Sequence, residues 1–222
     1  MANLSAVITA DMVNSESSWA KELGKRLEQT IYSAQGAAKV FFYRGDSFQV
    51  YLPDPYSAYR LALKLRTEAI LFEKDRPEVH TDVRISLGIG AVELPITQLA
   101  TAQGEAFVLS GRGFDELAKT DMRLNMHCGQ DSTQIALKTI SLFTDYLFHS
   151  LTTKQAAVLE HLLNHRTQVE TARLLKKIPI YRKQACAEYG LEAVGRADGF
   201  VRNKHSTNKQ PWIMQSSGSC DF

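Results

Sequence analysis

The chain has 222 residues, of which 44% are hydrophobic and 23% are charged, and its formal net charge is +2. This is ordinary globular composition, sufficient for one good core and a small second one, and the total charge indicates no class of partner. Three widely spaced cysteines without metal-ligand spacing, and no signal peptide, favour a reducing cytoplasm. No apolar run approaches the length of a membrane span, so we expect no membrane-spanning helix.

Short β-rich runs alternate with helical patterns along the first part of the chain. The strands are predicted at 4–10, 39–43, 47–52, 82–94 and 122–127. The helices are predicted at 19–31, 59–72 and 105–119. The first six elements follow the order strand, helix, strand, strand, helix, strand, which is the split βαβ or ferredoxin-like arrangement of the α+β class. Right-handed crossovers would place the first two helices on one face of an antiparallel sheet.

A helical segment is predicted behind this domain. A long amphipathic helix covers 134–149, and a second apolar helical pattern follows at 156–163. After a polar break, Thr167 and Glu170 form a T-x-x-E capping box that opens another short helix. Two short helices joined this tightly predict a helix-turn-helix. The chain thus divides into a ferredoxin-like domain, a connecting helix, the start of a helix-turn-helix and a tail, at 1–131, 132–150, 151–177 and 178–222.

Basic residues crowd the helix-turn-helix region, with Glu170 the only acid among them. The cluster comprises Arg166, Arg173, Lys176, Lys177, Arg182 and Lys183. Clustered positive charge is typical of contact with a phosphate backbone, and a solvated helix face explains it equally well. Arg173, Lys176 and Lys177 are the candidate DNA-binding residues.

Two aspartates are predicted to converge at one end of the sheet. Asp11 directly follows the first buried strand, and Asp46 lies in the turn between the second and third strands. Two carboxylates close together repel each other unless a cation lies between them. Mg²⁺ or Mn²⁺ favours such oxygen ligands, with substrate phosphates completing its shell. A Gly-Asp turn is also common without any ligand, so Asp46 in isolation is weak support.

The stretch after the first aspartate is a candidate phosphate site. Met12, Val13, Asn14 and Ser15 are predicted to enter a helix N-terminus, where backbone amides attract phosphate oxygens.

Four segments carry a family resemblance. They are, in chain order, AVITADMVNSES, YRGDSFQVYL, VRISLGIGAVEL and GEAFVLSGRGFDELAK. In this order they resemble the four landmark segments of the class III adenylate and guanylate cyclase domain. Together with the trailing helix-turn-helix, the arrangement resembles the small bacterial SatD-like proteins.

The resemblance implies roles for particular residues. Two aspartates bind the metal ions in the family, and Asp11 and Asp46 fall at those positions. Arg112 matches the family's transition-state Arg and is a weak catalytic candidate. Val108 stands where the family has a transition-state Asn, and the base-reading Asp, expected near Thr101, is absent. For the base-reading Lys, Lys39 is only a loose candidate.

Three functions follow from these residues. The favoured one is a nucleotide- and metal-binding regulator, a homodimer that also binds DNA through its helix-turn-helix. The alternative is an active nucleotide cyclase or a related nucleotidyl enzyme, and the third is a structural dimer domain without a ligand. The missing transition-state contacts favour binding over turnover, because their loss lowers turnover more than ground-state binding. The retained aspartates favour either of the first two over the third.

The composition changes at Ile178. Pro179 interrupts the place where a recognition helix should follow Lys177, and the remaining sequence has poor periodicity. Suppose that the coding DNA for Lys176, Lys177 and Ile178 contains one extra adenine. Removing it shifts the reading frame, and residues 178–189 can then be translated, with permitted codons, as SQYTVNKHAQSM. We therefore hypothesise that 178–222 are out of frame, the alternative being a natural, poorly patterned tail. Sequencing the coding DNA around Lys177 decides between them.

Overall fold

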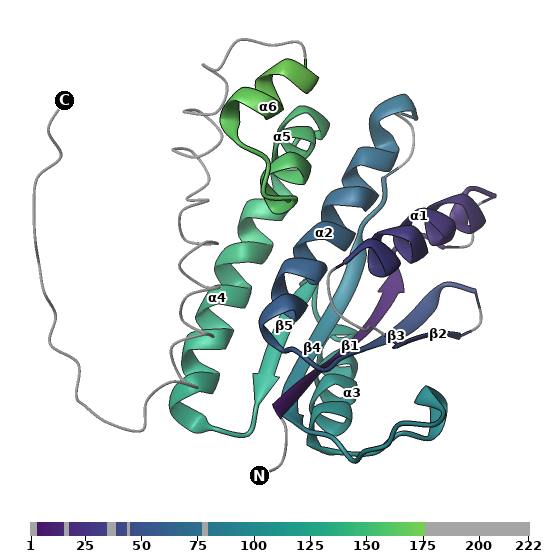
Figure 1. The fold of residues 1–222 in the computed structure, drawn as a ribbon, viewed down its shortest axis with the longest axis vertical. Coiled ribbons are helices and arrows are strands. Elements are labelled where there is room, and N and C mark those ends of the chain that lie inside the picture. Colours follow the sequence, from purple (N-terminus) through teal and green to yellow (C-terminus); the bar gives the residue numbers. More distant parts are fainter. Residues whose placement is uncertain (1–3, 16–17, 35–38, 44, 77–79, 176–222) are drawn as a thin grey trace, which may run out of the picture.

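The computed structural model describes residues 4–15, 18–34, 39–43, 45–76 and 80–175 (Figure 1). The strands are β1 (Leu4–Met12), β2 (Lys39–Tyr43), β3 (Ser47–Leu52), β4 (Val83–Ala91) and β5 (Leu124–Cys128). The helices are α1 (Ala20–Ser33), α2 (Tyr56–Phe72), α3 (Glu105–Leu117), α4 (Asp131–His149), α5 (Thr153–Leu163) and α6 (Gln168–Leu174). Two one-turn 3-10 helices, η1 (Glu73–Asp75) and η2 (Leu99–Thr101), lie in the connections.

The five strands form one sheet in the order β2-β3-β1-β4-β5. The first four pair antiparallel in the order expected for a ferredoxin-like fold, which confirms the predicted α+β class. β5 is added beside β4 in parallel, and α3 forms the crossover between these two strands. β1 therefore lies in the middle of the sheet, with β3 of the β2–β3 hairpin on one side and β4 on the other.

The main core lies between one face of the sheet and helices α1 and α2. Alternate residues of β1, among them Ala6, Ile8 and Ala10, point to this face and are buried. On α1 the buried residues recur at helical spacing, which gives the helix one apolar face against the sheet. Because both helices contribute to this core, the predicted placement of the two helices on one face is confirmed.

Helix α3 packs on the opposite face of the sheet. A smaller core lies there, formed by Val7, Tyr51, Ile96, Leu99 and Ala106. The helix comes so close to β4 that a Cβ at Gly88 would lie 2.3 Å from the carbonyl oxygen of Ala106. A residue without a side chain is required at this point of β4.

The later helices pack on the α1 and α2 side (Figure 1). α4 runs beside β5 and α2, and its Leu137 and Phe148 belong to the main core. The buried Arg66 of α2 joins α4 by donating to Asp145 at 2.8 Å, and it also pairs with Asp82 at 2.6 Å. α4 is therefore packed on the first domain as well as leading out of it.

Some element boundaries differ from those predicted. α2 contains all the residues predicted to lie within it and begins at Tyr56, because Pro55 already has helical backbone angles and the Asp54 carboxylate accepts from the Tyr56 amide at 3.0 Å. β4 ends at Ala91 rather than at Leu94, since the chain then pairs with the loop around Gly104. Within the described ranges no helix is both long and apolar enough to cross a bilayer.

Candidate functional site

Asp11 lies near the end of β1 and is held from both sides of the strand. Its cross-strand neighbours are Arg84 on β4 and Ser47 on β3, so the three side chains share the face that α3 covers in part. Arg84 donates from Nε to Oδ1 at 2.9 Å and from Nη2 to Oδ2 at 2.6 Å. This two-point contact is the geometry in which an arginine binds a carboxylate most strongly.

Asp46 lies in the turn between β2 and β3, directly beside the end of β1. Gly45, with a φ of 88°, makes the turn possible. The Asp46 carbonyl accepts from the amide of Met12 at 3.0 Å, which ties the turn to the residue after Asp11. The two aspartates are therefore at the same end of the sheet, as the strand order predicts.

The Asp46 carboxylate has donors of its own. Ser15 Oγ donates to its Oδ2 at 2.7 Å, and Ser47 Oγ donates to its Oδ1 at 3.3 Å. Ser47 is also the cross-strand neighbour of Asp11, so this serine is adjacent to both aspartates. The site thus holds two aspartates and one arginine rather than two uncompensated carboxylates.

This arrangement corrects one expectation. The sequence led us to expect repulsion between two carboxylates, but the Arg84 guanidinium already compensates the charge of Asp11. Among the described residues, no three His, Cys, Asp or Glu side chains gather as a preformed metal cage. A divalent ion here would have to take ligands from the two aspartates, from hydroxyls and from its substrate.

The predicted phosphate stretch is only partly free. The Met12 amide donates to Asp46, and the Val13 amide donates to the Asp82 carbonyl at 2.9 Å. The Met12 side chain is buried in the main core. Because α1 begins at Ala20, this stretch does not enter the helix directly, contrary to the prediction. The bonded amides of Met12 and Val13 are unavailable to a phosphate in this conformation.

The other two residues of that stretch shape the turn instead. Asn14 has a φ of 60°, and its Nδ2 donates to the carbonyl of His80 at 2.9 Å. Ser15 donates to Asp46, as described above. Both side chains thus position the chain after β1, and Ser15 is the one that contacts an aspartate directly.

A chain of polar side chains crosses the sheet on the same face as Asp11. Tyr43 donates to Gln49 Oε1 at 3.0 Å, and Gln49 donates in turn to Thr9 Oγ1 at 3.3 Å. Thr9 then donates to Ser110 of α3 at 3.0 Å. On α3, a Cβ at Gly111 would meet nothing within 4 Å. This part of the face is therefore polar and leaves free space beside α3.

Arg112 does not join the aspartates. Its neighbours Ser110 and Gly113 are buried toward the sheet, whereas Arg112 is exposed. Val108, one helical turn earlier, is also exposed. The two positions that resemble the family's transition-state residues therefore face away from their own sheet, where a second chain could reach them.

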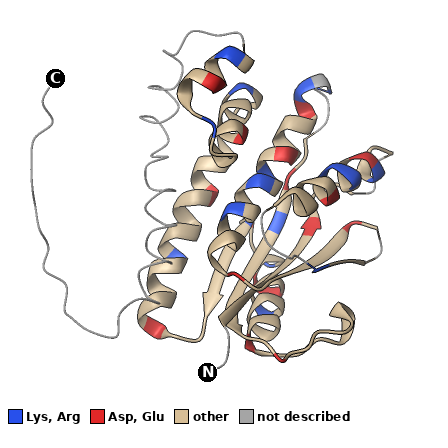
Figure 2. Ribbon diagram, in the orientation of Figure 1, with Lys and Arg blue, Asp and Glu red and all other residues tan. Residues whose placement is uncertain are grey.

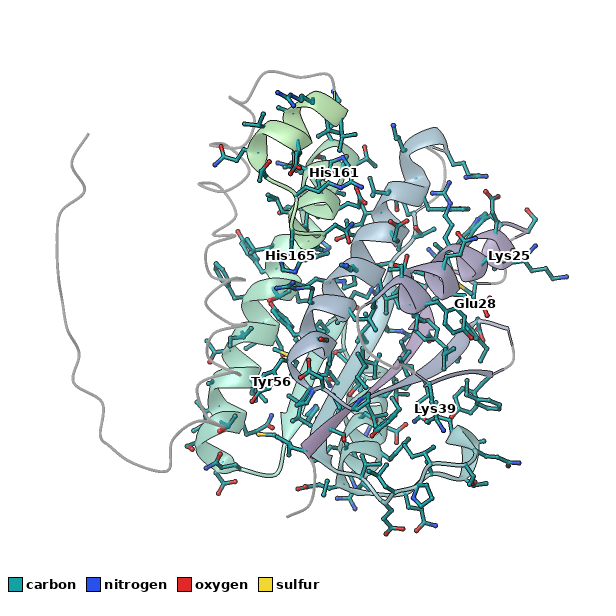
Figure 3. The ribbon with its side chains drawn as sticks, in the orientation of Figure 1. Lys25, Glu28, Lys39, Tyr56, His161 and His165 are labelled. Atoms are coloured by element: carbon teal, nitrogen blue, oxygen red, sulfur yellow. The ribbon has the colours of Figure 1, made fainter. Side chains whose placement is uncertain are left out.

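The loosely assigned base-reading positions lie at the other end of this face. Lys39, labelled in Figure 3, donates from Nζ to the carbonyl of Ile96 at 2.5 Å and so ties β2 to the loop before α3. Thr101 ends the one-turn helix η2 and is exposed.

The helical end of the chain has the expected capping. Thr167 and Glu170 form the predicted capping box at the start of α6, and Thr152 with Gln155 forms a second one at α5. Arg173 is exposed on α6. Lys176, Lys177 and the anomalous segment 178–222 lie outside the described residues, so the recognition helix and the frame hypothesis remain predictions.

Arg84 is the site residue that the sequence analysis missed. It is the second residue of β4, in a run that otherwise reads as a buried strand. Its register partner is Asp11, and only the pairing of β1 with β4 identifies that partner. The available signal was a charged residue, Arg84, at the start of an otherwise apolar strand, together with an aspartate at the end of the strand expected beside it.

No protein-family model matches the chain, and neither does any curated protein. Among solved structures, an adenylate/guanylate cyclase/hydrolase from Silicibacter pomeroyi is 22% identical, with 52% of this chain and 70% of that one covered and a TM-score of 0.39. A bacterial light-regulated adenylyl cyclase is 13% identical, with 57% and 43% covered and a TM-score of 0.38. Adenylate cyclases from Trypanosoma brucei are 18% identical, with 50% and 68% covered and a TM-score of 0.36.

Proposed function

We propose that this chain binds a nucleoside triphosphate together with Mg²⁺ or Mn²⁺ at the Asp11 and Asp46 end of the sheet. The observation that carries the proposal is that the paired Asp11 and Arg84 lie at the same end of the sheet as Asp46. Acidic and basic groups side by side suit a ligand that combines phosphate anions with a divalent cation.

Arg84 has two alternative partners in this proposal. In the structure its guanidinium holds both oxygens of Asp11. If a cation took Asp11 as a ligand, the Arg84 guanidinium would be available to bind a phosphate in the same two-point manner. The positive charge thus remains at the site while its partner changes.

The donors present fit a hard divalent cation. Asp11 and Asp46 supply carboxylate oxygens, and the hydroxyls of Ser15 and Ser47 lie beside them. A bound cation would neutralise phosphate charge and orient the phosphates. Within the predicted phosphate stretch, Ser15 would lie beside this ligand because its hydroxyl contacts Asp46, and Asn14 would hold the turn in place through His80.

Turnover is the second candidate function, favoured by the outward position of Arg112. In a dimer, Arg112 of one chain can reach the aspartates of the other, since it is exposed and lies away from its own. Val108 has no hydrogen-bonding group in its side chain, so it cannot supply the contact that an Asn would make there. We therefore expect cyclisation that is slow compared with binding.

DNA binding is the regulatory part of the proposal. The exposed Arg173 and the two predicted capping boxes are compatible with a helix-turn-helix. The printed sequence offers Ile178, Pro179 and Ile180 where base-reading residues should begin. We expect only non-specific binding to DNA, whose affinity falls steeply with salt.

One experiment tests binding and turnover together. The full chain is incubated with each nucleoside triphosphate and Mn²⁺, and the bound nucleotide and any cyclic product are measured in parallel. We expect metal-dependent binding of at least one nucleotide, with little product. In the same assay Val108→Asn should raise product without changing affinity. Equal, metal-independent affinities for wild type, Asp11→Asn and Asp46→Asn would contradict the proposed site.

A further inference from the structure

Helix α4 has two apolar faces, and the described part of the chain covers only one of them. Its inner face, with Leu137, Ser141, Thr144 and Phe148, is buried against β5 and α2. Its outer face carries large apolar side chains that are exposed. These are Ile135 (71% exposed), Leu142 (49%), Phe143 (49%) and Tyr146 (75%), and we call them the α4 stripe.

The α4 stripe has the spacing of a helix-pairing seam. Ile135, Thr139, Leu142 and Tyr146 follow one another at intervals of four, three and four residues, which is the heptad spacing of coiled coils. Charged residues are few along α4 (Figure 2), and Lys138 is the only Lys, Arg, Asp or Glu exposed between Ser132 and Phe148. Depletion of charge in the centre of an apolar patch is typical of protein interfaces.

We propose that the α4 stripe is the contact between two copies of this chain, related by a two-fold axis. A seam of this spacing is complementary to an identical one, which is the requirement for a two-fold interface. Aromatic side chains bury about 150–250 Å² each when fully covered. At the exposures given above, the four side chains offer on the order of 500 Å² per copy, and both copies together reach the roughly 1,000 Å² expected of a specific interface.

This contact leaves the proposed nucleotide site accessible. α4 packs on the side of the sheet that carries α1 and α2, whereas Asp11, Arg84 and α3 lie on the other side. The α4 contact is therefore distinct from a pairing through α3 that would bring Arg112 to a partner's aspartates. The inference does not rest on nucleotide binding, and the two can fail independently.

The test is the mass of the full chain in solution, measured by sedimentation over a range of concentrations. We expect a dimer whose dissociation constant rises at least tenfold in Leu142→Glu and in Tyr146→Glu. Both side chains are exposed in a single chain, so neither change should unfold it. Tyr32→Glu is the matched control, because Tyr32 is a 63% exposed aromatic on α1, and its dimer should be unaffected.

Three outcomes would overturn the inference. A chain that is monomeric at every concentration with α4 open to hydrogen exchange has no partner on this stripe. A monomer in which the outer face of α4 is protected would assign the stripe to another part of the same chain. A dimer that survives Tyr146→Glu and dissociates with Val108→Glu would place the contact on α3 instead.

Discussion

Arg84 holds both carboxylate oxygens of Asp11 across the β1–β4 ladder, with contacts of 2.9 and 2.6 Å. The Asp11 side chain is only 14% exposed, so this pair is largely shielded from water. The aspartate that the family resemblance assigns to a metal is thus paired with a protein cation. A metal ion at Asp11 would compete with the Arg84 guanidinium for these oxygens.

Removing Arg84 should change the affinity for the metal ion and the affinity for the nucleotide in opposite directions. In Arg84→Gln we expect Mn²⁺ alone to bind on the order of tenfold more tightly, because a competing unit charge close to the ion is gone. Nucleotide affinity in saturating Mn²⁺ should fall, since a phosphate partner is lost. Calorimetric titrations measure both, with Arg76→Gln as the control, because Arg76 is a half-buried arginine that pairs with Glu22 elsewhere. Equal changes in the same direction would contradict the exchange of partners.

The two aspartates should differ in their effect on stability without metal. Asp11→Asn loses the charged partner of Arg84 and should lower the free energy of unfolding by about 1–3 kcal/mol. Asp46→Asn should cost less, because the Asp46 backbone carbonyl, which the substitution keeps, makes the bond to Met12. Urea denaturation of both variants tests this. A more stable Asp11→Asn protein would show that repulsion, rather than the ion pair, dominates the site.

Arg66 should be among the most sensitive positions for stability. Its side chain is 1% exposed, bonds to both Asp82 and Asp145, and stacks at 4.7 Å on the ring of Phe148. Arg66→Met leaves two partly buried carboxylates without their cation, which should cost about 3–5 kcal/mol. Arg76→Met, which removes a surface ion pair, should cost no more than about 1 kcal/mol. Thermal and urea unfolding compare the two variants.

Substituting alanine at Gly88, which faces α3, and at Gly111, which lies within α3, should change the stability of the protein in opposite directions. Gly88→Ala forces a Cβ to within 2.5 Å of the Ser110 amide nitrogen, so the helix must move off the sheet at a cost of about 1–3 kcal/mol. Gly111 lies within α3, where an added Cβ meets nothing, so Gly111→Ala should stabilise the protein by up to about 1 kcal/mol. Unfolding curves for the pair provide the measurement, and a loss of stability in Gly111→Ala would count against the packing described.

His127 should make stability depend on pH. Burial lowers the pKa of His127 below its usual 6.5, with the more distant Glu116 carboxylate acting against this shift. The folded state therefore binds a proton less readily than the unfolded state, and stability should decline as the pH falls below about 6.5. His127→Gln should flatten the unfolding free energy between pH 7 and 5. An unchanged slope in this variant would assign the dependence to other groups.

Much of the fold was predictable from local patterns. The hairpin strands β2 and β3 match their predicted ranges, because alternating β-branched and aromatic residues flank a turn that needs a positive φ at Gly45. The order of the first six elements was sufficient to predict the ferredoxin-like sheet. β5 was predicted as a strand, but its parallel pairing with β4 was not, since pairing depends on contacts distant in sequence.

The sequence by itself determined that Asp11 and Asp46 lie at the same end of the sheet, because each ends or joins a strand whose neighbours follow from the fold class. It also determined the capping box at Thr167, since a cap involves only neighbouring residues. Only the tertiary structure decided that Arg84 neutralises Asp11 and that the Met12 and Val13 amides are already bonded. These contacts depend on strand register and join residues that are 34 to 73 positions apart in the chain, which no local pattern specifies.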